Sequence, residues 1–232
     1  MQNAFNKSSF LNGEIKFIAP VKPVSSQNNG VQKRTFRDEI QKITSKSQYI
    51  VTGTCWVAID YYCQHIKRQK NPGVYDMDNI VKPILDALVG MKGLIVDDVL
   101  VDRVTVNWID TPHDDHIEIE IQYPDLLFVK KSDLLFIKSE SGWCWPGPNQ
   151  LFAIDGFYQV IRKYFEIWDS IKSENDYYNL VYMLPIQPFL YYSKIKDRDY
   201  IFVELTKLDN GGLNTTNITK NTKENHGQQN QS

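Results

Sequence analysis

Alternation of apolar and polar residues predicts most of the strands in the first half of the chain. The longest case is residues 49–62, where Cys55, Val57, Ile59 and Tyr61 share one side that we expect to face the core. Gly53 interrupts this pattern and predicts a bulge. The expected strands here cover residues 49–62, 93–96, 101–109 and 117–123.

A helical period appears in residues 79–89. Ile80, Ile84 and Leu88 fall at i, i+4 and i+8, so they form one apolar face. Pro83 lies past the first turn, where we expect it to kink the helix or delay its regular part.

The ends of this helix carry their own signals. Asp78 is the expected N-cap, with Asn79 as the alternative. Gly90 stands where a left-handed residue commonly closes a helix.

Residues 126–208 show a different pattern. An amphipathic helix is expected over residues 155–172, and an aromatic loop over residues 142–148. In that loop, Trp143 and Trp145 predict either packing or stacking on unpaired bases. The expected strands cover residues 126–129, 134–138, 178–185 and 200–205.

These patterns predict an α+β fold: a small mixed sheet with two helices, followed by a second α+β unit. We place the first domain at residues 1–125 and the second at 126–208. Residues 209–232 are rich in Asn, Thr, Gln and Lys, so we expect a disordered tail.

Composition narrows the class of protein. The 232 residues are 42% hydrophobic with a net charge of −2, which supports a folded core and argues mildly against binding of DNA. We expect no contact with a membrane and no secretion, because there is no long apolar run and no signal-like start. Cys55, Cys63 and Cys144 lack metal spacing and predict buried free thiols in a reducing cytoplasm.

Acidic residues gather between residues 76 and 98. Asp76 and Asp78 flank one residue, so in an extended segment both carboxylates point to the same side. Lys82 follows one helical turn after Asp78, and Asp97 and Asp98 follow the predicted strand 93–96. Solvated helix caps are the structural alternative for each aspartate taken singly.

Carboxylates around one lysine suit a phosphodiester-cutting site. Mg²⁺ needs hard oxygen ligands and only a few protein carboxylates, since water and substrate phosphate complete its coordination. Lys82 could stabilise negative charge that develops on the phosphate or on the leaving oxygen.

Residues 76–88 read D-M-D-N-I-V-K-P-I-L-D-A-L, and an aspartate pair follows at 97 and 98. This pattern resembles the RusA family of Holliday-junction resolvases, whose signature is similar to D-x-D-N-[LI]-x-K-x-x-x-D-x-L. The resemblance covers about residues 12–125 and leaves the C-terminal half as an unrecognised extension. Residues 14–25 and 34–46 match, more loosely, the strand with a proline-rich turn and the basic helix that open the family.

The resemblance implies roles for particular residues. Asp76, Asp78 and Asp98 would be the metal-binding catalytic carboxylates, Asp97 a supporting member of the metal set, and Lys82 a required basic residue. Asn79 and Asp86 also match the signature, and for them we expect either structural roles or contacts that support the metal ligands from behind. The metal would be Mg²⁺, with Mn²⁺ able to substitute.

The resemblance also implies a homodimer that cuts four-way DNA junctions by paired nicks in recombination and repair. Basic residues near the acidic segment are the expected DNA contacts, with a solvated surface as the alternative. These residues are Arg34, Arg37, Lys67, Arg68 and Lys70.

Residues 111–116, which contain two histidines and two aspartates, predict a turn between strands in preference to a metal site.

Two other functions stay open from the sequence. A scaffold protein would bind DNA junctions without cutting them and would recruit a protein partner through residues 126–208. In the last interpretation the C-terminal half is the functional part, as a sensor or interaction domain.

Overall fold

The computed structural model describes residues 5, 10–70, 76–154, 156–180, 187–208 and 219–220. The fold is α+β with small mixed sheets, as the hydrophobic pattern predicts. Among the described helices, none has the length and apolar character that crossing a membrane requires.

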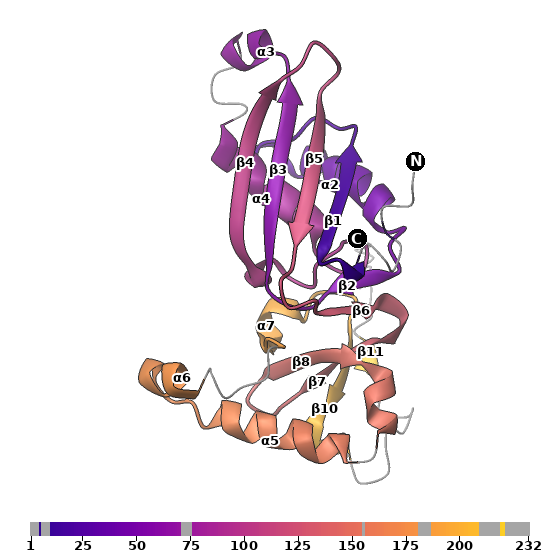
Figure 1. Ribbon diagram of the computed structural model, residues 1–232, viewed down its shortest axis with the longest axis vertical. Helices are drawn as coiled ribbons and strands as arrows, with labels where there is room; N and C mark the ends of the chain where they lie inside the picture. Colours follow the sequence, from indigo (N-terminus) through magenta and orange to yellow (C-terminus); the bar gives the residue numbers. More distant parts are fainter. Residues whose placement is uncertain are drawn as a thin grey trace, which may run out of the picture.

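The first sheet has the strand order β1-β5-β3-β4 (Figure 1). Strand β5 pairs antiparallel with both β1 and β3, whereas β3 and β4 are parallel. The strands span Glu14–Ala19 (β1), Cys55–Cys63 (β3), Val101–Asp110 (β4) and His116–Gln122 (β5).

Two helices cover one face of this sheet (Figure 1). They are α2 (Gly30–Thr44) and α4 (Met77–Leu88), which pack against each other. Their apolar sides join the inward side of β3 in one buried cluster, including the predicted Cys55, Val57, Ile59 and Tyr61. The short helix α3 (His65–Lys70) follows β3.

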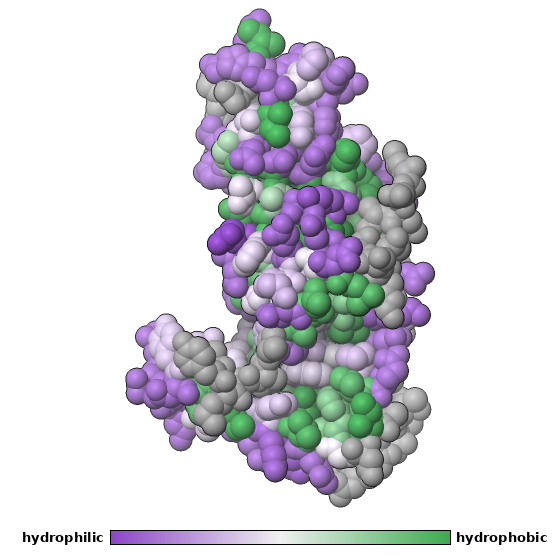
Figure 2. Space-filling model, viewed as in Figure 1, coloured by the Kyte–Doolittle hydropathy of each residue, from purple (hydrophilic) through white to green (hydrophobic). Residues whose placement is uncertain are grey.

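The other face of the first sheet is open to solvent. It mixes hydrophilic and hydrophobic residues in Figure 2, and Ile18 is 58% exposed there. Lys16 pairs on this face with Glu14 and Glu120. Because this face carries charged side chains, it does not form a second hydrophobic core, in contrast to the face that α2 and α4 cover.

The second sheet has the order β11-β10-β7-β8-β9 and lies beyond the first (Figure 1). Its strands span Leu134–Lys138 (β7), Trp143–Pro148 (β8), Leu190–Tyr191 (β9), Ile201–Glu204 (β10) and Thr219–Lys220 (β11). The helices of this half are α5 (Phe157–Asp169), α6 (Glu174–Leu180) and α7 (Tyr192–Ile195). Short 3-10 turns span Asp98–Leu100 (η1), Lys131–Asp133 (η2), Asn149–Ala153 (η3) and Leu205–Lys207 (η5).

Both faces of the second sheet are buried. Leu135 and Ile137 of β7 pack against α5, whereas Leu134 and Phe136 pack on the opposite side. A strand buried on two faces has a continuous apolar run, and residues 134–137 have one.

The two halves of the chain share a buried cluster. Ile50, Val96 and Leu100 come from the first half and are at most 3% exposed. They pack with residues of the second half, including Phe136 and Tyr200. Strand β2 (Tyr49–Val51) also pairs with β6 (Phe128–Lys130), so backbone hydrogen bonds cross the boundary predicted at residue 125.

Several predicted elements differ from those observed. The strand expected over residues 49–62 is two strands in different sheets, because the chain turns at 52–54 and Gly53 packs against Leu127. Residues 93–96 form only isolated bridges through Ile95, with Val51 and Val89.

The remaining differences lie in the second half and at the start of α4. The aromatic segment 142–148 is strand β8, and Tyr178 lies in helix α6 instead of a strand. Residues 181–186 and most of the predicted tail lie outside the described residues. The N-cap of α4 is Asp76, so Asp78 lies in the first turn instead of capping it.

Candidate functional site

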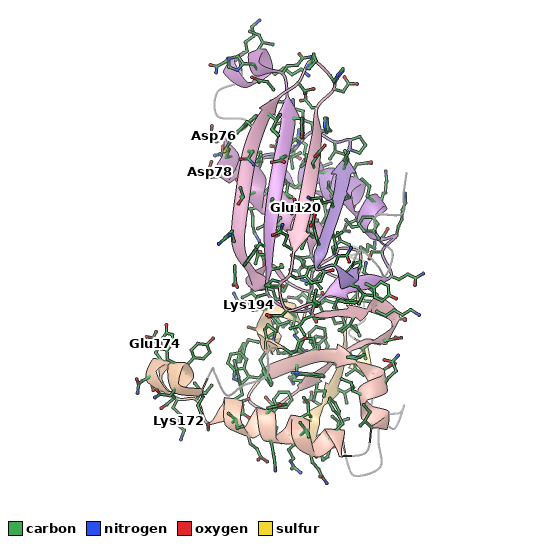
Figure 3. The ribbon with its side chains drawn as sticks, viewed as in Figure 1. Asp76, Asp78, Glu120, Lys172, Glu174 and Lys194 are labelled. Carbon is green, nitrogen blue, oxygen red and sulfur yellow. The ribbon has the colours of Figure 1, made fainter. Side chains whose placement is uncertain are left out.

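Helix α4 presents two of the predicted carboxylates at its start. Asp76 is the N-cap, without a capping hydrogen bond from its side chain, and Asp78 lies in the first turn. Both residues are exposed, and Figure 3 shows them near each other at this end of the helix. The positive end of the helix dipole favours negative charge at this position. Pro83 is buried within the helix, which continues to Leu88.

Asn79 ties the start of α4 to the loop that precedes α2. Its side-chain oxygen accepts a hydrogen bond from Ser26 Oγ at 2.9 Å, and its backbone oxygen accepts one from the Ser26 amide at 2.7 Å. On the other side of the loop, Asn29 caps α2. These bonds support the structural role predicted for Asn79.

Lys82 lies between two aspartates. Its ammonium group donates to Asp86 Oδ1 and to Asp98 Oδ2, each at 2.7 Å. Partial burial would lower the pKa of Lys82, but these hydrogen bonds outweigh it, so the pKa is raised. Burial would likewise raise the pKa of Asp98, yet the hydrogen bond and charge of Lys82 hold that pKa below its ordinary value. Lys82 and Asp98 are therefore both ionised at neutral pH.

Asp97 has a different cationic partner from Asp98. It caps η1 by accepting a hydrogen bond from the Val99 amide at 3.2 Å. Its other carboxylate oxygen accepts from Arg198 Nη2, also at 3.2 Å. The residue is 3% exposed, and this burial raises the pKa of Asp97 despite both hydrogen bonds.

The predicted metal ligands differ in how open they are. Asp76 and Asp78 are exposed and Asp98 is half-buried, so their hard oxygen atoms are accessible and suit a cation such as Mg²⁺. Asp97 is enclosed, since only 4% of its side chain is exposed. In the described part of the chain, no three acidic, histidine or cysteine side chains converge closely enough to hold a metal ion. The metal-binding roles therefore stay a prediction.

The helix geometry relates Asp78 to the lysine centre. Residues four apart on a helix lie on one face, about 6 Å apart along its axis. Asp78 therefore lies one turn before Lys82, which in turn contacts Asp98. The structure thus brings Asp78, Lys82 and Asp98 to one side of α4.

The predicted DNA contacts fall on two helices. Arg34 and Arg37 are exposed on α2. Lys67 and Lys70 lie on α3, which ends seven residues before the first residue of α4. Lys67 is already paired with Asp115 at 2.9 Å, and the side chain of Arg68 lies outside the described residues.

The other candidate motifs have structural contacts. Residues 111–115 form the predicted connection between β4 and β5, and His116 begins β5 and stacks on Tyr62, with ring centroids 4.4 Å apart. Trp143 packs edge-on against Trp168, and Trp145 is 8% exposed beside Phe157. These contacts favour packing over base stacking for both tryptophans.

Sequence reasoning missed Arg198. The residue lies 101 positions beyond its partner Asp97, in a segment without any recognised motif. A buried carboxylate needs a cationic partner, so knowing that Asp97 is buried would have indicated one. The sequence does not show this burial, because two adjacent aspartates are expected to be exposed.

Comparison with known proteins identifies the first half. Residues 20–122 match the sequence model of the family described as Endodeoxyribonuclease RusA. The family comprises endodeoxyribonucleases that resolve Holliday junctions, so the predicted class of enzyme is confirmed. The matched segment contains every predicted site residue, whereas Arg198 and the rest of the second half lie outside it. A comparison with curated proteins found no match to this chain.

Proposed function

We propose that this protein is a metal-dependent nuclease that cuts four-way DNA junctions by paired phosphodiester hydrolysis, in recombination and repair. The observation that carries the proposal is the position of Lys82 between Asp86 and Asp98, one helical turn from Asp78. The match of residues 20–122 to the RusA family supports the same substrate class.

Each side chain has a role in this proposal. Asp76, Asp78 and Asp98 bind Mg²⁺, for which Mn²⁺ can substitute, and Asp97 supports them. When bound, the metal polarises a phosphoryl oxygen and lowers the pKa of an attacking water. Lys82 is charged and partly exposed, so it can stabilise the negative charge that grows on the phosphate during cleavage.

DNA would approach from the side of α3 and the start of α4. Arg34, Arg37, Lys67, Arg68 and Lys70 are the proposed phosphate contacts. The open sheet face is less suitable, because it carries Glu118 and Glu120 beside Asp60. Repulsion of phosphates by these carboxylates favours binding elsewhere.

The proposed assembly is a homodimer in the cytoplasm. Symmetric cuts across a two-fold junction need two active sites related by a two-fold axis. Three buried free cysteines suit a reducing compartment, as predicted. Residues 126–208 remain a proposed site for a protein partner.

A cleavage assay tests the proposal. Purified protein is incubated with a labelled four-way junction, with Mg²⁺ or with EDTA, beside the variants Asp78→Asn and Lys82→Gln. We expect symmetric nicks that need Mg²⁺ and fall by at least about 100-fold in either variant. Asp125→Asn is the matched control, because it removes an exposed carboxylate outside the site.

The other outcomes separate the alternatives. Tight junction binding without cleavage by the unaltered protein would favour the scaffold function. Cleavage that persists in EDTA would contradict the metal site. If the protein neither binds nor cuts the junction, the C-terminal half becomes the candidate for the functional part. Sedimentation of the protein with a junction measures whether two copies bind.

A further inference from the structure

The loop that carries Asp97 and Asp98 is held by the second half of the chain. Tyr200 donates from its hydroxyl to the backbone oxygen of Val96 at 2.6 Å. Arg198 donates to Asp97 at 3.2 Å. Val96 and Leu100, on either side of the aspartate pair, are buried in the cluster shared by the two halves. Contacts from outside the RusA-type segment therefore help to hold this loop.

Burial makes the Arg198 contact consequential. The Asp97 side chain is 4% exposed, whereas that of Arg198 is 34% exposed. A buried carboxylate that loses its cationic partner is strongly unfavourable, because water cannot replace the partner. The Asp97 side chain is thus restricted to the direction of Arg198.

Arg198 is itself held in place by a tight turn. Its amide donates to the Ile195 backbone oxygen at 3.1 Å, and its backbone oxygen accepts from the Tyr200 amide at 2.8 Å. This turn joins α7 to β10, and Tyr200 is 2% exposed. Arg198 therefore extends from a packed element and not from a free loop.

The backbone of Asp97 links this anchor to the site. The backbone at Asp97 is extended, with a φ of −154° and a ψ of 151°, and the η1 turn begins at the next residue, Asp98. Asp97 points to Arg198, and Asp98 points to Lys82 on α4. Because the two residues are adjacent, holding the Asp97 side chain at Arg198 limits the positions that the Asp98 carboxylate can take.

We propose that Arg198 is a positioning residue that the C-terminal extension contributes to the nuclease site. It anchors Asp97 so that Asp98 is directed at Lys82 and the substrate phosphate. The proposal rests on the nuclease function proposed above. It assigns Asp97 to orientation of the loop, and it makes the second half necessary for cleavage although that half lies outside the family match.

The first test measures the loop in the full chain without metal or DNA. Hydrogen exchange is followed by mass spectrometry in peptides that cover residues 96–101, where the Val99 amide donates to Asp97. We expect Arg198→Gln to accelerate exchange there by at least about tenfold, with unchanged exchange in β3 and β5. Lys194→Gln is the matched control, because it removes one exposed positive charge from the neighbouring helix α7 (Figure 3).

The second test measures single-turnover cleavage of a bound junction. We expect Arg198→Gln to lower this rate by about 10- to 100-fold, with an unchanged Kd for the junction. Arg198→Lys should restore part of the rate, because it returns a cation to Asp97. Asp97→Asn should cost less than Asp98→Asn, since its one amide oxygen can still accept from either Arg198 or Val99, whereas Asp98→Asn removes the carboxylate that faces Lys82.

Tyr200→Phe keeps the test decisive if Arg198→Gln does not fold. It removes only the hydroxyl that holds Val96, and we expect faster exchange in residues 96–101 with slower cleavage. Unchanged exchange in the variants, or faster exchange with full cleavage, would overturn the positioning role. Absence of cleavage by the unaltered protein would overturn the nuclease function and the role in cleavage with it, whereas the exchange result would still decide whether Arg198 anchors the loop.

Discussion

Lys82 and Arg198 each pair with one of two adjacent aspartates, and they come from different halves of the chain. Lys82 contacts Asp98 from helix α4, and Arg198 contacts Asp97 from the second half. Burial acts to raise the pKa of both carboxylates: it prevails at Asp97, whose pKa is raised, but the hydrogen bond and charge of Lys82 outweigh it at Asp98, whose pKa is lowered. Neighbouring residues of the same type thus have different chemistry because their surroundings differ.

Lys131 carries a partly buried positive charge that destabilises the folded state. Burial lowers the pKa of its ammonium group from 10.5 to about 8. Its hydrogen bond to the Thr44 backbone oxygen is 3.5 Å long, which is too weak to offset burial. Below about pH 8 the group is charged in both states, so the folded state carries the full cost.

We therefore expect Lys131→Met to stabilise the protein at neutral pH. The gain in free energy of unfolding should be on the order of 1–2 kcal/mol, since solvent screening reduces the cost. Between about pH 8 and 10.5 the unfolded state binds more protons, so the unaltered protein gains stability and the difference shrinks. Urea unfolding of both proteins at neutral and alkaline pH measures this difference in free energy of unfolding. A difference that stays the same at alkaline pH would contradict burial of the charged ammonium group as its cause.

At the scale of elements, the turn after α4 sets where the aspartate loop begins. Gly90 has a φ of 92° and ends the helix in the left-handed region, as predicted. The amides of Leu94 and Ile95 then donate to the Leu88 backbone oxygen. The chain folds back so closely that Gly93 has no room for a side chain.

Gly93→Ala should consequently destabilise the protein. A Cβ atom at this position would lie 1.9 Å from the Leu88 backbone oxygen, so the backbone must move. We expect a loss of roughly 2–3 kcal/mol in the free energy of unfolding, measured by urea titration. Gly30→Ala is the control, because a Cβ atom in helix α2 would meet nothing within 4 Å. Similar losses in both variants would contradict the steric reason.

At the scale of the whole molecule, the two halves are joined by packing and by hydrogen bonds. Thr52 and Gln187 exchange two hydrogen bonds, at 2.9 and 2.8 Å, beside the β2–β6 pair. The shared cluster also contains Ile50, Val96 and Leu100. Such contacts indicate that the halves stabilise each other.

A fragment of residues 1–125 should therefore fail to fold to the native state. It would expose apolar side chains that the second half covers and would leave β2 without its partner β6. We expect circular dichroism without a cooperative thermal transition and no junction cleavage, in contrast to the full chain. A fragment with a sharp transition and full activity would show that the second half is an accessory.

Much of the first sheet could be predicted because its information is local. Alternation along β3, β4 and β5 identified the strands, and the 3.6-residue period identified α4 and its buried face. The split near Gly53 escaped prediction, because both segments alternate and only their pairing partners differ. Strand β8 was also not predicted. Its proline and glycine residues indicate a loop, but the segment forms a strand whose two faces are both covered by other parts of the chain.

The sequence by itself determined the acidic motif, its place on an amphipathic helix and the class of enzyme, because spacing along a helix sets which side chains share a face. Tertiary structure alone decided the pairing of Lys82 with Asp98 and of Arg198 with Asp97. These contacts join residues 16 and 101 positions apart. The difference in pKa and burial between the two aspartates depends on the packing of the two halves, which the local pattern does not specify.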